Sequence, residues 1–188
     1  WLKYEGISLT GKTMGIIGLG SIGLAIAERG NAFNMNIIGH DPSPSAAAAK
    51  IDFIEQVRFE DICRRSDFIT LACNLTSENH HLISQKAFSL MKRGVYLINV
   101  SRGPLVCEDD LVDALKNETV AGVGLDVFEI EPLPLTSSLL GFDHCIFGAH
   151  NGSNTKDAVV RVNDMTIDMC TKILQGPIEE VYPNRRVA

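Results

Sequence analysis

The stretch Met14–Gly23, which reads MGIIGLGSIG, decides the fold of this chain. Its first four residues are apolar, long enough for a buried strand, and they lead directly into a loop that contains three glycines. After the loop, Ile22, Ala25 and Ile26 recur at helical spacing on one face. We expect Gly30 to end this helix, because glycine readily adopts a left-handed backbone. The stretch therefore predicts a strand, a tight turn and a helix, the start of a βαβ unit.

Each glycine of the loop has a separate physical role. Gly18 permits the tight turn, Gly20 lets the backbone approach a bound pyrophosphate, and Gly23 lets the helix pack close to the strand. A pyrophosphate would then lie at the N-terminus of the helix, where free N–H groups and the helix dipole favour an anion. The glycine pattern alone is a weak signal, but its place between a strand and a helix predicts a dinucleotide site.

An acidic residue, Asp41, follows Gly18 by 41 − 18 = 23 residues and stands at the end of the next predicted strand. Its carboxylate can accept hydrogen bonds from both hydroxyls of the adenine ribose of NAD. The 2′-phosphate of NADP would face a like charge there, and no arginine occurs between residues 41 and 57. His40 and Lys50 are the only cationic candidates nearby. The sequence therefore favours NAD as the cofactor.

Apolar runs of strand length alternate with helical patterns along the rest of the chain. This alternation predicts an α/β fold with a doubly wound parallel sheet, a Rossmann fold in three α/β/α layers. Further strands are expected at residues 36–39, 68–71, 95–98, 120–125 and 145–147. Helices are expected at residues 59–65, 85–91 and 108–116, and a closing helix from about Val162 to Ile173 should stop at Gly176–Pro177. Residues 1–188 would form a single domain with an N-terminal arm at 1–10 and a C-terminal segment at 177–188.

Composition limits the classes of function. The 188 residues are 45% hydrophobic and 21% charged, with a net charge of −6, which is typical of a globular core and argues against nucleic acid as the main partner. No apolar run approaches the roughly 20 residues of a membrane span. The five cysteines lack metal-ligand spacing, and the adjacent His80 and His81 do not share a face, so we expect no metal site. An odd number of cysteines without a framework indicates reduced thiols and a cytoplasmic location.

Three residues far apart in the chain lie in distinctive local sequences. Arg102 lies in NVSRGPLV, Glu131 lies in LDVFEIEP, and His150 lies in GAHN. With the glycine loop upstream, these segments resemble, in the same order, those of the NAD-dependent D-2-hydroxyacid dehydrogenases, which include phosphoglycerate, glycerate and D-lactate dehydrogenases. The resemblance runs from about Gly11 to about Gly176. It implies hydride transfer between NAD and a small D-2-hydroxy acid.

This reaction needs side chains of these types. Removal of hydride from a hydroxyl-bearing carbon also requires loss of the hydroxyl proton, and His150 suits the base because histidine titrates near neutrality. The resemblance implies that Glu131 hydrogen-bonds the other ring nitrogen and that Arg102 binds the substrate carboxylate through its planar fork. It assigns Glu131 rather than Glu129, because the matching acid directly precedes the proline. Spacing alone leaves both acids open.

The resemblance also implies which residues contact the cofactor. These expected contacts are Gly18, Gly20, Ser21, Ile22, Gly23, Asp41, Cys73, Val100, Ser101, Arg102, Asp126, His150 and Gly152. In the family, the aspartate that matches Asp126 approaches the nicotinamide carboxamide, and the residues that match Ser21 and Ile22 bind the pyrophosphate. The loop after the strand at 68–71 departs from the family pattern, because relatives usually carry histidine and proline where this chain has Ala72 and Asn74.

Family members have a second, substrate-binding domain that has no counterpart among these residues. We therefore expect no activity from this chain alone, because half of the cleft is missing. We also expect a homodimer, because the family pairs through the cofactor domain and the N-terminal arm carries apolar residues (Trp1, Leu2, Ile7 and Leu9). One alternative is an NAD-regulated binding protein of the corepressor type, since such relatives can keep the three catalytic residues. A second alternative is oxidation of formate or phosphite, which is less favoured because formate enzymes typically carry glutamine at the position of Glu131.

Overall fold

The structure, a computed structural model, describes residues 6–44, 48 and 51–175. Contacts divide the chain into two compact units, Trp1–His150 and Asn151–Ala188, and the second contains α5 (Lys156–Gln175). The closing helix is therefore confirmed, whereas its stop at residues 176–177, the start of the arm and the C-terminal segment lie outside the described residues. The expectation of one domain over the whole chain stays a prediction. Among the described residues, no helix combines the length and hydropathy that a membrane crossing needs.

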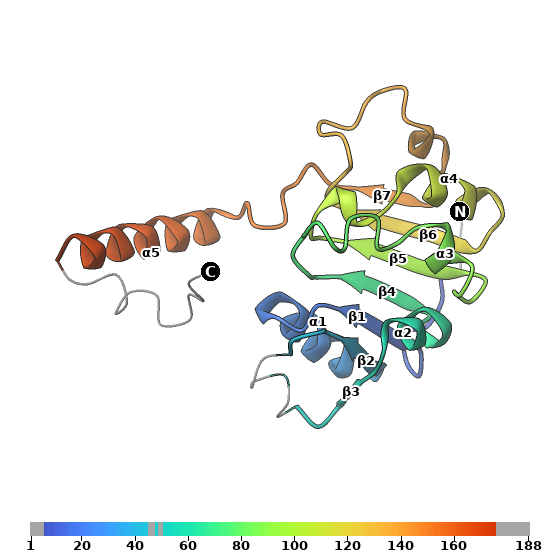
Figure 1. The fold of residues 1–188 in the computed structure, drawn as a ribbon, viewed down its shortest axis with the longest axis horizontal. Coiled ribbons are helices and arrows are strands. Elements are labelled where there is room, and N and C mark those ends of the chain that lie inside the picture. The colour runs from blue at the N-terminus through green and yellow to red at the C-terminus, as the bar shows by residue number, and fades with distance from the viewer. Residues whose placement is uncertain (1–5, 45–47, 49–50, 176–188) are drawn as a thin grey trace, which may run out of the picture. The chain divides into compact units, whose positions relative to one another are not determined.

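A seven-stranded, fully parallel sheet forms the centre of the Trp1–His150 unit (Figure 1). Its strands lie in the order β3-β2-β1-β4-β5-β6-β7. Their bounds are β1 (Thr13–Ile17), β2 (Asn36–His40), β3 (Ile54–Gln56), β4 (Phe68–Leu71), β5 (Val95–Asn99), β6 (Val120–Leu125) and β7 (Cys145–Phe147). The predicted strands are confirmed. β3 was not predicted, because three residues are too few to show a period.

Helices connect most of these strands. Their bounds in the first unit are α1 (Ser21–Ala32), α2 (Phe59–Arg65), α3 (Gln85–Phe88) and α4 (Glu108–Lys116), with 3₁₀ turns η2 (Gly103–Leu105) and η3 (Ser138–Gly141). α2 and α4 have the predicted bounds, whereas α3 ends three residues before the predicted Met91. The N-terminus of α3 is held by Asp110, whose Oδ2 accepts a hydrogen bond from the N–H of Gln85 at 2.7 Å.

Apolar side chains pack on both faces of the sheet. Ile17 and Ile38 belong to a core that includes α2, α3 and α4, whereas their chain neighbours Ile16 and Ile37 belong to a core that includes Ala27 of α1. Successive side chains of a strand point to opposite faces, so α1 covers one face and the other three helices cover the opposite one. The predicted three-layer α/β/α arrangement of a Rossmann fold is therefore confirmed.

Small residues form the packing face of α1. Its buried residues are Gly23, Ala27 and Gly30, whereas Ile22 is 60% exposed. A Cβ on Gly30 would lie 2.8 Å from Cδ1 of Ile37, so this glycine permits close contact between the helix and β2. The prediction that Gly30 ends the helix is wrong, because α1 continues to Ala32. Close packing of α1 on β2, and not a left-handed backbone, explains why residue 30 is a glycine.

The order of the strands places a crevice at the carboxyl end of β1. This strand lies between β2 and β4, and the chain proceeds outward from it in both directions. The connections that follow β1 and β4 therefore leave the sheet toward opposite faces. In open α/β sheets, ligands bind in the crevice that such a reversal creates. The glycine loop that follows β1 lies at this point.

Gly23→Ala should lower the free energy of unfolding by about 1–3 kcal/mol. A Cβ at this position would lie 1.9 Å from the carbonyl oxygen of Gly18, and this backbone cannot move without separating α1 from β1. Urea denaturation of the two proteins measures the difference. Gly20→Ala is the matched control, because no atom lies within 4 Å of a Cβ there. Equal stability of Gly23→Ala and the unchanged chain would contradict the close packing.

Candidate active site

The glycine loop is held from two sides. Gly18 has a φ of +98°, and a Cβ there would lie 2.6 Å from the backbone nitrogen of Cys73, so the loops after β1 and β4 are in contact. The N–H of Leu19 donates to Oδ2 of Asp41 at 2.8 Å, and the N–H of Ser43 donates to Oδ1 of Asp41 at 2.8 Å. The carboxylate of Asp41 therefore links the end of β2 to the glycine loop.

A hollow of about 730 Å³ opens where these loops meet. The predicted cofactor residues Gly18, Gly20, Asp41 and Cys73 line it, and Ser21–Gly23 form the first turn of α1. The site thus combines N–H groups of a helix N-terminus with a carboxylate at the end of the neighbouring strand. This set of groups fits the pyrophosphate and the adenine ribose of NAD.

A second hollow, of about 440 Å³, includes Asp41 and two arginines that sequence analysis missed. Arg58 and Arg65 follow β3, after the arginine-free stretch 41–57, and the parallel pairing of β3 with β2 brings them near the end of β2. Nε of Arg58 donates to Oδ2 of Asp61 at 3.3 Å. Arg65 binds both carboxylate oxygens of Glu55, at 2.8 and 2.5 Å. Each guanidinium therefore already has a carboxylate partner.

A buried amide shapes the loop after β5. Asn99 is 1% exposed; its Oδ1 accepts from the N–H of Ser101 at 3.0 Å, and its Nδ2 donates to the carbonyl of Arg102 at 2.9 Å. Oγ of Ser101 donates to the carbonyl of Cys73, which joins this loop to the loop after β4. Asn99 was missing from the predicted site, although a polar residue at the end of an apolar strand was a usable signal.

His150 and Glu131 form a hydrogen-bonded pair. Nδ1 of His150 lies 2.8 Å from Oε2 of Glu131, whose Oε1 accepts from the N–H of Phe128 at 3.0 Å. The two side chains are 50% and 37% exposed, respectively. The hydrogen bond with His150, followed by that from Phe128, holds the pKa of Glu131 below its ordinary value, and the positive charge of Arg102 adds to the effect. Glu129, the acid that spacing left open, contacts a different histidine, His81.

Three neighbouring strand ends bring the predicted catalytic residues together. Arg102 follows β5, Glu131 follows β6 and His150 follows β7. The backbone N–H of His150 donates to the carbonyl of Asp126 at 2.8 Å. A Cβ on Gly148 would lie 2.1 Å from Oδ1 of Asp126, so the carboxylate of Asp126 lies against the loop that leads to His150. The order of strands in the sheet thus determines the order of residues in the site.

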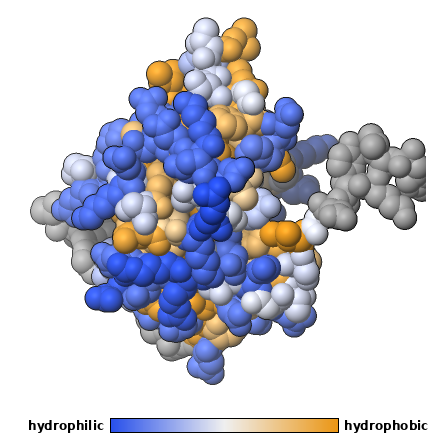
Figure 2. Space-filling model, turned by 90° about the vertical axis from the view of Figure 1, so that its right-hand side faces the viewer, coloured by the Kyte–Doolittle hydropathy of each residue, from blue (hydrophilic) through white to orange (hydrophobic). Residues whose placement is uncertain are grey.

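Apolar surface surrounds the His150–Glu131 pair. The pair lines a hollow of about 580 Å³ whose other walls include Phe128, Leu140 and Phe147. The loop between β6 and β7 carries exposed apolar side chains, among them Leu135, which is 94% exposed. Apolar residues lie at the top of the molecule in Figure 2. The pair is therefore the polar part of a hollow whose other walls are largely apolar.

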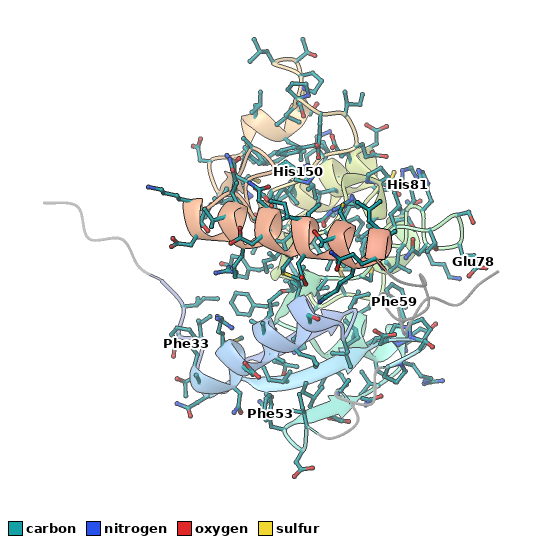
Figure 3. All side chains as sticks on the ribbon, turned by 90° about the vertical axis from the view of Figure 1, so that its left-hand side faces the viewer. Phe33, Phe53, Phe59, Glu78, His81 and His150 are labelled. Carbon is teal, nitrogen blue, oxygen red and sulfur yellow. The ribbon has the colours of Figure 1, made fainter. Side chains whose placement is uncertain are left out.

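Two further residues, Val100 and Gly152, were predicted to contact the cofactor. Val100 is 39% exposed in the loop after β5, so its backbone lies at the same edge of the sheet. Gly152 belongs to the second unit, and its cofactor contact stays a prediction. In Figure 3, His150 lies in the upper part of the first unit, whereas Phe33, which follows α1, and Phe53, which precedes β3, lie in its lower part. Among the described residues, no group of three or more histidine, cysteine or acidic side chains could hold a metal ion.

Known proteins are similar to this chain in both sequence and structure. D-3-phosphoglycerate dehydrogenase of Methanocaldococcus jannaschii is 38% identical over 97% of this chain and 35% of its own length. Glyoxylate reductase of Aeropyrum pernix is 37% identical over 97% of this chain and 54% of its own length. The D-lactate dehydrogenase of Aquifex aeolicus, solved with NAD and lactic acid, superposes with a TM-score of 0.86 at 29% identity, covering 98% of this chain and 60% of that one.

The chain spans about a third to a half of the length of these curated relatives. The family described as "D-isomer specific 2-hydroxyacid dehydrogenase, NAD binding domain" matches residues 1–152. The matched range contains the glycine loop and the ends of all seven strands, and so the whole hydrogen-bonded arrangement described above. This chain therefore belongs to the NAD-binding domain family of the D-isomer specific 2-hydroxyacid dehydrogenases.

Proposed function

We propose that the protein that contains this chain transfers a hydride between NAD and a small D-2-hydroxy acid. The observation that carries the proposal is the 2.8 Å contact between Nδ1 of His150 and Oε2 of Glu131, at the same edge of the sheet as the glycine loop. Oxidation of an alcohol by hydride removal needs a base for the hydroxyl proton, and a histidine oriented by a carboxylate suits that task.

The residues around the crevice are assigned to the cofactor. The glycine loop and the first turn of α1 would bind the pyrophosphate, and Asp41 would accept hydrogen bonds from the adenine ribose. The N–H of Leu19 now occupies Oδ2 of Asp41, which holds the carboxylate at the mouth of the hollow. When bound, NAD supplies the acceptor for the hydride. Asp126 would lie beside the nicotinamide, at the end of β6.

The residues at the ends of β5, β6 and β7 are assigned to the substrate. His150 would take the hydroxyl proton on Nε2, because its Nδ1 is bound to Glu131. Glu131 would fix the tautomer and stabilise the imidazolium that forms. Arg102 would bind the carboxylate of the substrate. Its Nη1 now donates to the carbonyl of Ser101 at 2.7 Å, so the guanidinium would turn to reach that carboxylate.

We also propose that the domain pairs as a homodimer in the cytoplasm. The support is apolar side chains on the face of the sheet that α1 covers in part. Phe68 packs on that face and is in register with Tyr96, so Tyr96 and Ile98 point the same way. Ile98 is aligned through β6 with Ile146, which is 76% exposed. The five cysteines, all free, support a reducing compartment.

NAD should bind this chain about 30-fold more tightly than NADP, because a phosphate beside the carboxylate of Asp41 costs about 2 kcal/mol. Calorimetric titration with each nucleotide measures the two affinities. Asp41→Ala should narrow the difference. Arg58→Ala should leave NAD affinity unchanged, because Arg58 is already paired with Asp61. NADP binding as tight as NAD binding would remove the assignment of Asp41.

In the intact dehydrogenase, Glu131→Gln should lower kcat by about 10²–10⁴-fold and leave the affinity for NAD nearly unchanged, since Glu131 acts through the imidazole. Its lowered pKa keeps the carboxylate ionised, and the pair intact, below the ordinary pH range of glutamate, so the substitution should shift the acidic limb of the pH profile. Glu118→Gln, at an exposed acid paired with Arg93, is the control. If Glu129→Gln lowered kcat more than Glu131→Gln, Glu129 would be the acid that orients the imidazole.

Ile146→Glu should convert the dimer into a monomer, because a charge in the centre of an apolar interface lacks a partner. Light scattering at micromolar concentration measures the mass. The substitution should hardly change the free energy of unfolding, because the side chain is exposed. Leu135→Glu, on the loop between β6 and β7, is the control for added charge. A monomeric unchanged chain would refute the proposed pairing.

A further inference from the structure

His81, which is labelled in Figure 3, forms hydrogen bonds with two loops of the proposed site. Its backbone N–H donates to the carbonyl of Pro104 at 2.8 Å, in the segment that follows Arg102. Its ring nitrogen Nε2 lies 2.5 Å from Oε1 of Glu129, in the segment that leads to Glu131. The backbone of one residue thus holds the loop after β5, and its side chain holds the loop after β6.

Glu129 is held through its other oxygen and its backbone as well. Its Oε2 accepts from the N–H of Glu108 at 2.8 Å, and its own N–H donates to Oε1 of Glu108 at 2.7 Å. Burial raises the pKa of Glu108, and the negative charge of Glu129 contributes to the rise. The ring of His81 contacts Glu129 and so contributes to holding this pair of acidic residues in place. The imidazole and Glu129 are 35% and 26% exposed, so water screens this contact less than a surface ion pair.

Close packing completes the connection between the loops. A Cβ on Gly103 would lie 1.8 Å from the carbonyl oxygen of Phe128 and 2.5 Å from the nitrogen of Glu129. Ile83 forms a parallel bridge with Val106, which extends the hydrogen bonding that His81 begins. The segments 81–83, 103–108 and 128–131 are therefore joined by backbone, side-chain and packing contacts. A change in one contact should displace the loop after β6 relative to the loop after β5.

We propose that His81 is a positioning residue, which sets the place of the Glu131 carboxylate relative to Arg102 by holding Glu129. The proposal rests on the proposed function, in which Glu131 orients His150. His81 is assigned no contact with substrate or cofactor. Its effect passes through Glu129 to the short segment that ends at Glu131. The position of this segment matters because Oε1 of Glu131 accepts a hydrogen bond from the N–H of Phe128 within it.

The backbone at His81 indicates that its side chain matters. Its φ is +53°, in the left-handed region, where a residue with a Cβ is less stable than glycine by roughly 1 kcal/mol. A histidine there lowers stability unless its ring makes a compensating contact, and the contact with Glu129 is of that kind. Asn34, which is exposed, has nearly the same φ of +57°. It provides a matched control for changes to the backbone.

The test compares His81→Gly with Asn34→Gly in the 188-residue chain. Both substitutions relieve a left-handed backbone, but only the first removes a ring that binds a carboxylate. The readout is the pKa of Glu131, followed by the ¹³C NMR signal of its carboxyl group. His81→Gly should raise this pKa toward the ordinary value for glutamate, because a displaced Glu131 loses its contact with His150, whereas Asn34→Gly should leave it unchanged. His81→Gln, which keeps a donor, should give an intermediate pKa.

The intact dehydrogenase provides an independent readout. His81→Gly should lower kcat by about 10–100-fold without changing the affinity for NAD, and His81→Gln should recover part of the loss. An unchanged Glu131 pKa in folded His81→Gly would overturn the proposal whatever the kinetics show. A Glu131→Gln enzyme with full activity would refute the proposed function and leave the NMR result to decide the role of His81. If His81→Gly does not fold, the same measurement on Glu129→Gln tests the proposal. This substitution should also raise the pKa of Glu131, whereas the control Glu118→Gln should leave it unchanged.

Discussion

The short distance between α1 and β1 is the constraint on which the rest of the structure depends. It forces Gly23 against the carbonyl of Gly18, and it thereby curls the loop so that its next N–H reaches Asp41. The same curl presses Gly18 onto the backbone at Cys73, and the carbonyl of Cys73 in turn accepts a hydrogen bond from Ser101. Contacts therefore run from the cofactor loop along the edge of the sheet to the loops that carry the proposed catalytic residues.

Most of the fold could be predicted because strands of a parallel sheet are buried on both sides and appear as unbroken apolar runs. β4 and β6 have their predicted bounds for this reason. β3 is too short to form such a run. The end of α1 was mispredicted because the reason for Gly30 is a neighbour in space, Ile37, which periodicity within one helix does not detect.

The site could be predicted from the sequence wherever a functional residue stands in a recognisable motif of its own segment. Arg102, Glu131 and His150 stand in motifs, and the parallel sheet brings the ends of their strands together. His81 was missed as a partner because its contact crosses between segments far apart in sequence. Arg58 was missed because it lines a hollow with Asp41 only through the pairing of β3 with β2. In the sequence, His81 stands out only as the neighbour of His80. Its role depends on an acid 48 residues away, which no spacing within one segment indicates.

Both edges of the sheet end in very short strands. β3 and β7 have three residues each, while the strands between them have four to six. An edge strand presents unpaired N–H and C=O groups that can template a strand from another molecule, and a short edge offers few of them. Growth of the sheet from molecule to molecule, the first step toward fibrils, is therefore disfavoured. The fold can carry exposed apolar side chains on a sheet face with little risk of aggregation through its backbone.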